Sequence, residues 1–309
     1  MLLCFFQIID NHKNISFNQE KISRRSVELT KVEIKMSKTI FLMVCLMLLF
    51  MWAGQEIGGQ QGMITAFWMA CAMNFTSYFF SDSLVLSHYK AMRVDENNAP
   101  QLYDIVGRLA AQANLPMPKV YIIPEQVPNA FATGRDHKHA AVAVTQGLLE
   151  LMTPEEIEGV LAHEMSHINH YDILIGSVAA VFAGAIAMLG NTMRSSSARH
   201  NNRNGIIGIL LTPVAASLIQ MAISRTREYK ADEGAAYLTA HPEWLMSALT
   251  KLEGYAQNNQ MQRATKQTAH MFIVNPFSGL KNFSHLFSTH PSTENRIARL
   301  AAIKEHLEV

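Results

Sequence analysis

Long apolar stretches dominate the pattern of this chain. Residues 39–53, 63–80, 173–189 and 205–223 contain no charged side chain. Their length and lack of charge favour membrane-spanning helices, although a buried hairpin in a soluble domain is the alternative for the last two. The pattern therefore predicts four transmembrane helices, arranged as hairpins within residues 36–90 and 173–223.

Shorter amphipathic segments separate the apolar stretches. Residues 100–115 place apolar side chains on one helical face. A helix that starts at Pro154 and another over residues 242–255 are also predicted. Residues 119–123 predict a strand. Residues 130–133 and 140–145 flank Gly134-Arg135-Asp136, which is typical of a hairpin. We expect a mainly α protein with a small β-sheet in residues 91–172 and more helices in residues 224–309.

The composition agrees with a membrane protein and excludes several other classes. Of 309 residues, 49% are hydrophobic and 17% are charged, which is below the usual quarter for soluble domains. The net charge of +1 shows no basic excess, so nucleic acid is not an expected partner. The three cysteines share no metal-binding spacing and predict no disulfide framework.

Basic residues indicate the orientation of the first hairpin. Its loop, residues 54–62, holds no Lys or Arg, whereas basic residues precede and follow the hairpin, which predicts that both ends are cytoplasmic. The loop of the second hairpin carries three arginines, so this pair either inserts against the rule or does not fully span. Residues 1–35 are a polar extension, and we expect translation to begin at Met36.

The most informative motif is His163-Glu164-Met165-Ser166-His167, which reads H-E-x-x-H. Thr153 and Glu156 form a capping box ahead of it and predict a helix. Residues four apart share one helical face, so both histidines can bind one metal ion while Glu164 reaches a water beside it. This arrangement is typical of a zinc hydrolase.

Several residues compete for the role of third metal ligand. A metzincin is excluded because His170 and Ile173 occupy the positions of its required Gly and His. Glu228 is the best candidate, and Asp232, four residues later, suits the spare N–H of a ligating imidazole. Glu233 and His170 are alternative ligands, and a solvated, salt-bridged face is the alternative for Glu228 and Asp232.

Four segments together resemble one known family. They are residues 127–134 (VPNAFATG), 163–172 (HEMSHINHYD), 224–232 (SRTREYKAD) and 288–297 (STHPSTENRI). In this order, from about Met36 to near the C-terminus, they resemble the HtpX family of membrane zinc proteases, which is related to the CAAX prenyl proteases. The implied fold is a membrane-anchored, gluzincin-like metalloprotease.

The resemblance also implies roles for individual residues. His163, His167 and Glu228 would bind one Zn²⁺ per chain, with Glu164 as general base and Asp232 behind the ligands. His290 and Arg296 match residues that contact the substrate carbonyl or its transition state. From the sequence alone they read as a loop histidine and a surface charge. The residues that match the substrate-binding segment are Asn129, Ala130, Phe131 and Ala132.

The implied activity is zinc-dependent endopeptidase cleavage of misfolded or damaged membrane proteins. It would take place at the cytoplasmic face of a bacterial inner membrane, in contact with the lipid bilayer, and would include self-cleavage. An intramembrane protease is disfavoured because Glu155, Glu156 and Glu158 are too charged for a bilayer interior. Two further candidate functions are a prenyl-protein processing enzyme and a non-catalytic membrane scaffold or chaperone.

Overall fold

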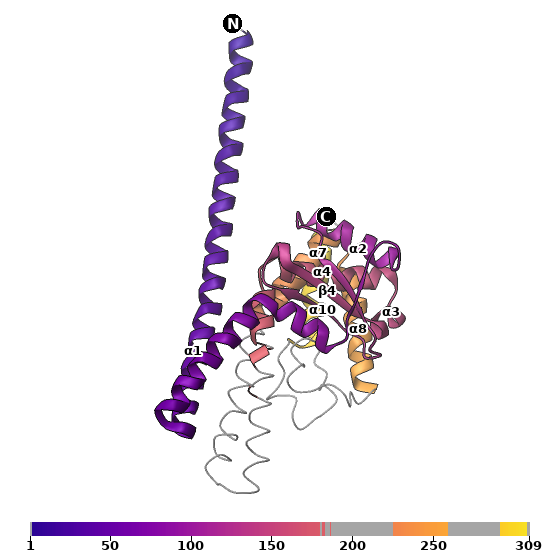
Figure 1. Cartoon of the computed structure of the whole chain (residues 1–309). Coiled ribbons are helices and arrows are strands. Elements are labelled where there is room, and N and C mark those ends of the chain that lie inside the picture. The colour runs from indigo at the N-terminus through magenta and orange to yellow at the C-terminus, as the bar shows by residue number, and fades with distance from the viewer. Residues whose placement is uncertain (1, 180, 183–185, 187–224, 259–290, 308–309) are drawn as a thin grey trace. The chain divides into compact units, whose positions relative to one another are not determined.

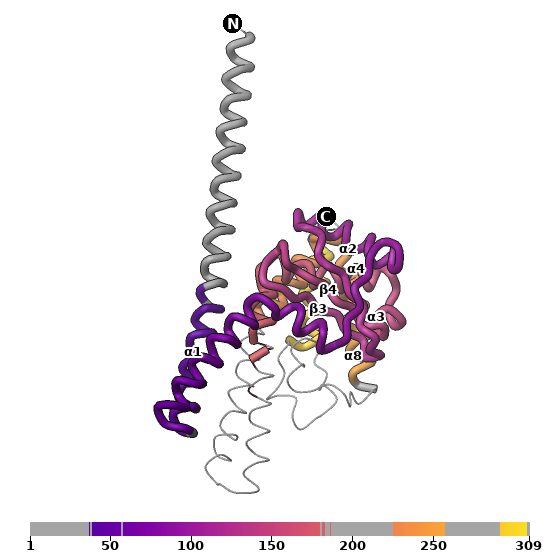
Figure 2. Tube along the Cα trace, in the orientation of Figure 1, coloured from indigo at the N-terminus to yellow at the C-terminus, as the bar shows by residue number. Residues whose placement is uncertain are grey.

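The computed structural model describes the backbone of residues 2–179, 181–182, 186, 225–258 and 291–307. Within these ranges, the side chains of residues 2–36, 38, 57, 257 and 258 are not described. Figure 2 draws in grey the residues whose placement is uncertain. The chain divides into two compact units, Met1–Cys45 and Leu46–Val309, and each is described by itself.

A long helix, α1 (Leu2–His88), forms the first unit and continues into the second. It bends at Gly58 and Gly59, where Gly59 has a φ of 57°, a conformation that glycine adopts readily. The two arms approach each other closely near the bend, because a Cβ on Gly54 would stand 2.6 Å from the Cβ of Ala66. The turn therefore lies within the predicted loop, residues 54–62.

The described residues contain one stretch that is long and apolar enough to span a membrane, Thr39–Glu56. It includes the predicted first span, residues 39–53. The predicted second span, residues 63–80, is helical but less apolar, because Asn74, Thr76 and Ser77 interrupt it. Most of the predicted second hairpin, residues 173–223, lies outside the described residues, although residues 173–179 are helical. The prediction of four spans is therefore not confirmed.

A four-stranded mixed sheet forms the centre of the second unit, in the order β1-β2-β4-β3. β2 (Lys119–Ile123) pairs parallel with β4 (Ala140–Thr145). β1 (Met92–Val94) and β3 (Ala130–Gly134) pair antiparallel with β2 and β4, so that β3 is an edge strand. The predicted strand and hairpin are confirmed. β1 was missed because three residues are too few to show a strand period.

Both faces of the sheet are covered, which explains why all six residues of β4 are buried and apolar or small. Val142 and Val144 join a core with α2 (Pro100–Gln112) and α4 (Pro154–Asn169). Ala141 and Ala143 face the opposite way and join Val85 of α1. The sheet therefore fixes α4 on one side, and β3 packs directly against α4.

The short helix α3 (Gln146–Leu151) follows β4 and packs against it, and three longer described helices follow α4 along the chain. α7 (Arg225–Thr239) and α8 (Pro242–Asn258) both pack against it, and α10 (Thr293–Leu307) packs against α7 and α8 (Figure 1). The predicted mainly helical fold with a small sheet is confirmed, as is the capping box of Thr153 and Glu156 at the start of α4. α2 ends three residues before its predicted end, because Asn114 takes a φ of 53° and closes the helix.

Candidate metal centre

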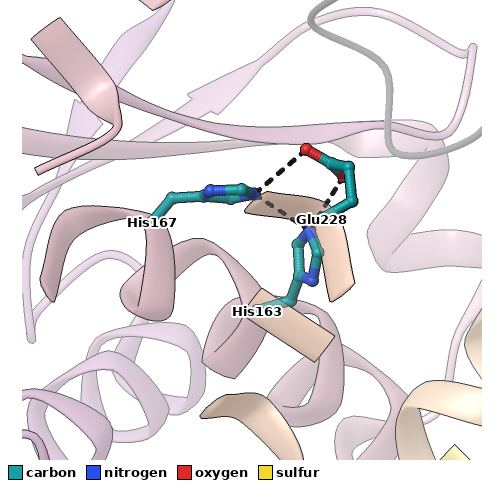
Figure 3. A group of neighbouring side chains, drawn as sticks. All are labelled: His163, His167 and Glu228. Carbon is teal, nitrogen blue, oxygen red and sulfur yellow. Dashed lines mark hydrogen bonds and ion pairs between the residues drawn. The ribbon is translucent and has the colours of Figure 1, made fainter. Parts of the chain in front are cut away.

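Three side chains converge from two helices (Figure 3). His163 and His167 lie one turn apart on α4, and Glu228 lies in the first turn of α7. The Nε2 atoms of the two imidazoles are 3.2 Å apart. The Glu228 carboxylate places Oε2 3.7 Å from Nε2 of His163 and Oε1 3.7 Å from Nε2 of His167.

This arrangement fits a tetrahedral metal ion. Ligand atoms at about 2.1 Å from zinc in a tetrahedral arrangement stand about 3.4 Å from one another. One donor atom from each of the three side chains lies within 4.8 Å of the other two, and within the described ranges no other cluster of His, Cys, Asp or Glu meets this criterion. Two imidazoles and one carboxylate are a donor set found in zinc hydrolases, in which one coordination position stays open.

A carboxylate and a guanidinium lie behind His163. Asp232 places Oδ1 2.9 Å from Nδ1 of His163. Arg296 donates to the same carboxylate from Nε to Oδ2 at 2.8 Å and from Nη2 to Oδ1 at 2.6 Å. None of the three side chains is more than 2% exposed. The contact at Nδ1 leaves Nε2 of His163 directed toward the other two donors, as a ligating imidazole requires.

The second imidazole has a similar arrangement with longer contacts. Asp172 places Oδ2 3.5 Å from Nδ1 of His167. Nε of Arg227 lies 3.9 Å from Oδ1 of Asp172. Asp172 is not among the site residues predicted from the sequence, although its position just beyond the active-site helix favours a contact with a ligating histidine.

Glu164 connects α4 to the free edge of the sheet. Its side chain is buried, and Oε2 accepts a hydrogen bond of 2.8 Å from the backbone N–H of Ala132. Ala132 lies on β3, opposite Val142 of β4. Its N–H therefore points away from the β3–β4 ladder, toward the side on which a further strand would add.

Burial and neighbouring charges shift the pKa values of three side chains in the site. Burial raises the pKa of Glu164. Burial would lower the pKa of His163, but hydrogen bonds with Asp232 and Glu228 outweigh it and raise that pKa to about 9. Burial would likewise raise the pKa of Asp232, but Arg296 lowers it to about 2. Without a metal, a proton on His163 thus balances the carboxylates, and a cation would take over that role.

The alternative third ligands lie elsewhere. Glu233 is exposed on α7 and is not part of the group formed by His163, His167 and Glu228. His170 follows the end of α4 and packs beside α7, where a Cβ on Gly234 would stand 3.8 Å from its Cε1. Of the three candidates, the structure brings only Glu228 to the two histidines.

The other predicted site residues differ in their placement. His290 lies outside the described residues. Arg296 is buried behind His163, and its guanidinium is paired with the Asp232 carboxylate. A direct contact of Arg296 with a substrate carbonyl stays a prediction. The backbone of Asn129 bonds to Thr145 beside the sheet.

The predicted substrate segment lies on the edge strand, with its side chains divided between the two faces of the sheet. Ala130 joins the core that includes α4. Phe131 instead packs with α1 on the opposite face, and its ring centroid is 5.7 Å from that of Tyr89. Ala132 is the member of the segment whose backbone reaches Glu164.

Comparison with known proteins identifies the family. Residues 96–304 match the model described as Peptidase family M48. The chain belongs to peptidase family M48. This M48 peptidase is 65% identical over 278 residues to the Protease HtpX homolog of Campylobacter hominis, a match that covers 87% of this chain and 99% of the relative.

A second relative gives a lower identity over almost the same length. The M48 peptidase is 52% identical over 275 residues to the Protease HtpX homolog of Pyrococcus furiosus, covering 86% of this chain and 95% of the relative. Among solved structures, the crystal structure of S. mikatae Ste24p gives a TM-score of 0.47 at 20% identity, covering 88% of this chain and 67% of that one. The predicted membership of the HtpX family is confirmed, and the M48 peptidase is a metallopeptidase.

Proposed function

We propose that this metallopeptidase is a membrane-bound zinc endopeptidase. Its substrates are misfolded or damaged membrane proteins, which it cleaves at the cytoplasmic face of a bacterial inner membrane, and it also cleaves itself. One observation carries the proposed chemistry. Glu164, which directly follows one candidate ligand on α4, is hydrogen-bonded to the free edge of the sheet, where an extended peptide can bind.

His163, His167 and Glu228 would hold the single Zn²⁺. When bound, the ion supplies a Lewis acid and lowers the pKa of a water molecule to about 7. The protein contributes the orientation of the donors. Asp232 fixes His163 through Nδ1, and Arg296 keeps Asp232 ionised although it is buried.

Glu164 is the general base in this proposal. Its carboxylate takes the proton of the attacking water and later passes it to the leaving amine. Burial raises the pKa of Glu164, which suits a group that must both accept and return a proton near neutral pH. The hydrogen bond from Ala132 holds one carboxylate oxygen and leaves the other for the water.

The edge strand β3 would bind the substrate. An extended peptide adds to an exposed edge by main-chain hydrogen bonds, which recognise the backbone and not particular side chains. Such recognition suits an enzyme that cleaves unfolded segments of varied sequence. The Arg296 guanidinium is hydrogen-bonded to Asp232, so we propose that Arg296 acts on the metal site through Asp232. His290 is then the residue that contacts the substrate carbonyl.

Exposed apolar side chains support attachment to a membrane. Thr39–Glu56 is long and apolar enough to span, and the second arm of the α1 hairpin exposes large apolar side chains along its length. Such a surface is expected of a segment that faces lipid. We propose that residues 63–80 and the hairpin of residues 173–223 supply the other three spans. The exposed residues of the second arm include Ile64, Trp68, Met69, Phe75, Phe79 and Phe80.

The substitution Glu164→Gln tests the mechanism. It removes the base while keeping the size of the side chain, so we expect cleavage of casein by the detergent-purified protein to be abolished while zinc content is unchanged. Glu155→Gln is the matched control, because Glu155 lies exposed in the first turn of the same helix. Casein cleavage by the Glu164 variant at the rate of the unmodified protein would refute the mechanism.

A further inference from the structure

The turn that ends α4 brings a second carboxylate to the metal centre. The N–H of Tyr171 donates to the carbonyl of Ile168 at 3.0 Å, and the N–H of Asp172 donates to the carbonyl of His167 at 2.9 Å. Tyr171 has a φ of 58°. This pair of bonds around a left-handed residue is a Schellman motif, which satisfies the last carbonyls of the helix.

Asp172 contacts His167 both through its backbone and through its side chain. The backbone of Asp172 is bonded to the carbonyl of His167, and its carboxylate Oδ2 lies 3.5 Å from Nδ1 of the same histidine. The carboxylate is thus held by the local turn, five residues from the imidazole, and it is 8% exposed. It contacts the imidazole nitrogen opposite to the one that faces Glu228 and His163.

Contacts on both sides hold this turn in place. Nε of Arg227, the residue that precedes Glu228, lies 3.9 Å from Oδ1 of Asp172. The ring of Tyr171 stacks on His137 in the β3–β4 connection, with 3.8 Å between centroids and 24° between planes. The turn therefore contacts both the β3–β4 connection and the start of α7.

We propose that Asp172 is a positioning residue of the metal site. It fixes the tautomer and the ring orientation of His167, with Nε2 directed at the shared metal position, as Asp232 does for His163. Arg227 supplies the opposite charge to Asp172, as Arg296 does to Asp232. The two imidazoles are thus each held between a metal position and a carboxylate. This inference rests on the proposed zinc site and deepens it.

The test measures zinc affinity in the detergent-purified full chain by competition with a chelator. All variants carry Glu164→Gln, which prevents self-cleavage. Asp172→Asn keeps the shape and the backbone turn but removes the charge. We expect it to weaken zinc binding by about 10- to 100-fold, the usual effect of losing a group that orients a metal ligand.

Asp136→Asn is the matched control, since the amide oxygen can still accept the backbone N–H groups of Lys138 and His139. Asp136 also pairs with a histidine, His139, with 2.7 Å between Oδ1 and Nδ1, but this histidine is not a candidate ligand. Loss of the Asp136 charge should leave zinc affinity within about twofold. The visible spectrum of the cobalt-substituted protein gives a second readout. We expect this spectrum to change in the Asp172→Asn variant, because His167 is displaced, and to stay the same in the control variant.

Each possible outcome either supports or refutes the proposed role of Asp172. Weaker zinc binding by Asp172→Asn, with an unchanged melting temperature of the metal-stripped protein, supports the role. Unchanged affinity overturns it, and so does a loss of affinity that is matched by a loss of stability in the metal-stripped protein. If the Glu164→Gln parent itself binds no zinc, the proposed zinc site has failed. Binding by the parent together with unchanged affinity of the variant refutes only the role of Asp172.

Discussion

Asp232 and Arg296 face each other in the core as an ion pair with two hydrogen bonds, of 2.6 and 2.8 Å. The pair joins α7 to α10, and Asp232 also contacts Nδ1 of His163. A change at Arg296 therefore reaches the candidate ligands without altering any of them.

Arg296→Ala should destabilise the protein severely. It would leave the Asp232 carboxylate buried without its partner, which typically costs about 3–5 kcal/mol. Arg296→Lys keeps the charge but cannot form both bonds, so we expect an intermediate loss. The free energy of unfolding, from urea titration in detergent, is the measurement.

Arg299 on the same helix provides the comparison. Its guanidinium lies 3.8 Å from the ring centroid of Tyr229 on α7. Arg299→Ala should cost about 1 kcal/mol, the usual size of a cation–π contact. Equal losses from the two alanine variants would show that the buried ion pair has no special importance.

Gly234→Ala should separate the two helices that carry the candidate ligands. A Cβ on Gly234 would stand 2.5 Å from Oγ and 3.0 Å from Cβ of Ser166 on α4. We expect a loss of about 1–3 kcal/mol from overpacking. Metal affinity should fall as well, because Glu228 lies on α7 and both histidines lie on α4.

A second substitution tests this explanation. Ser166→Ala removes the nearest atom, so it should restore part of the stability and metal affinity of the Gly234→Ala variant. Gly107→Ala is the control, since nothing lies within 4 Å of a Cβ there and the change should stabilise α2 by about 1 kcal/mol. A Gly234→Ala variant as stable as the unmodified protein would contradict the close contact.

Glu228→Ala should reduce the zinc content of the purified protein well below one ion per chain, because it removes one of three donors. Glu233→Ala, five residues along the same helix, should bind zinc as the unmodified protein does, since Glu233 is exposed. Atomic absorption on the two variants gives the answer. The reverse pattern would transfer the ligand role to Glu233.

The stability of the metal-stripped protein should depend on pH through His163. Its pKa is about 9 when folded, against a usual value of 6.5. Because folding raises this pKa, the stabilisation is complete below about pH 6.5 and is lost as the pH rises through about 9. We expect the free energy of unfolding to fall by on the order of 3 kcal/mol across this range.

The zinc-loaded protein provides the control for this pH series. A ligating imidazole carries no proton on Nε2, so the same decrease should be absent when zinc is bound. Stability of the metal-stripped protein that stays constant from pH 6.5 to 9 would show that the carboxylates do not hold a proton on His163.

Local sequence patterns predicted the part of the site that lies on α4. The capping box, the start of α4 and the shared face of His163 and His167 depend on residues within one helix, and the structure agrees with each. The choice between Glu228 and Glu233 depends instead on which face of α7 meets α4. Ala231, Asp232 and Ala235, which follow Glu228 at helical spacings of three, four and seven residues, are buried with it, whereas Glu233 is exposed. The pattern within α7 favours Glu228 through Asp232 four residues later, but it leaves Glu233 as an alternative.

The other differences have two separate causes. Asp172 reaches His167 through a turn in which Tyr171 takes a left-handed conformation that sequence rules reserve for glycine or asparagine. Arg296 reads as a surface charge because its partner, Asp232, is 64 residues away. Long-range packing therefore buries Arg296, whereas an unusual local turn places Asp172 beside His167.

The order of the helices along the chain has a consequence for biosynthesis. α4 leaves the ribosome first, α7 follows, and α10 is the last of the described helices to be made. Until α10 has emerged, Asp232 lacks its guanidinium partner and α7 lacks a surface against which it packs. The metal centre of a nascent chain is thus incomplete until α10 has been made, so we expect hydrolytic activity only after nearly the whole chain has emerged.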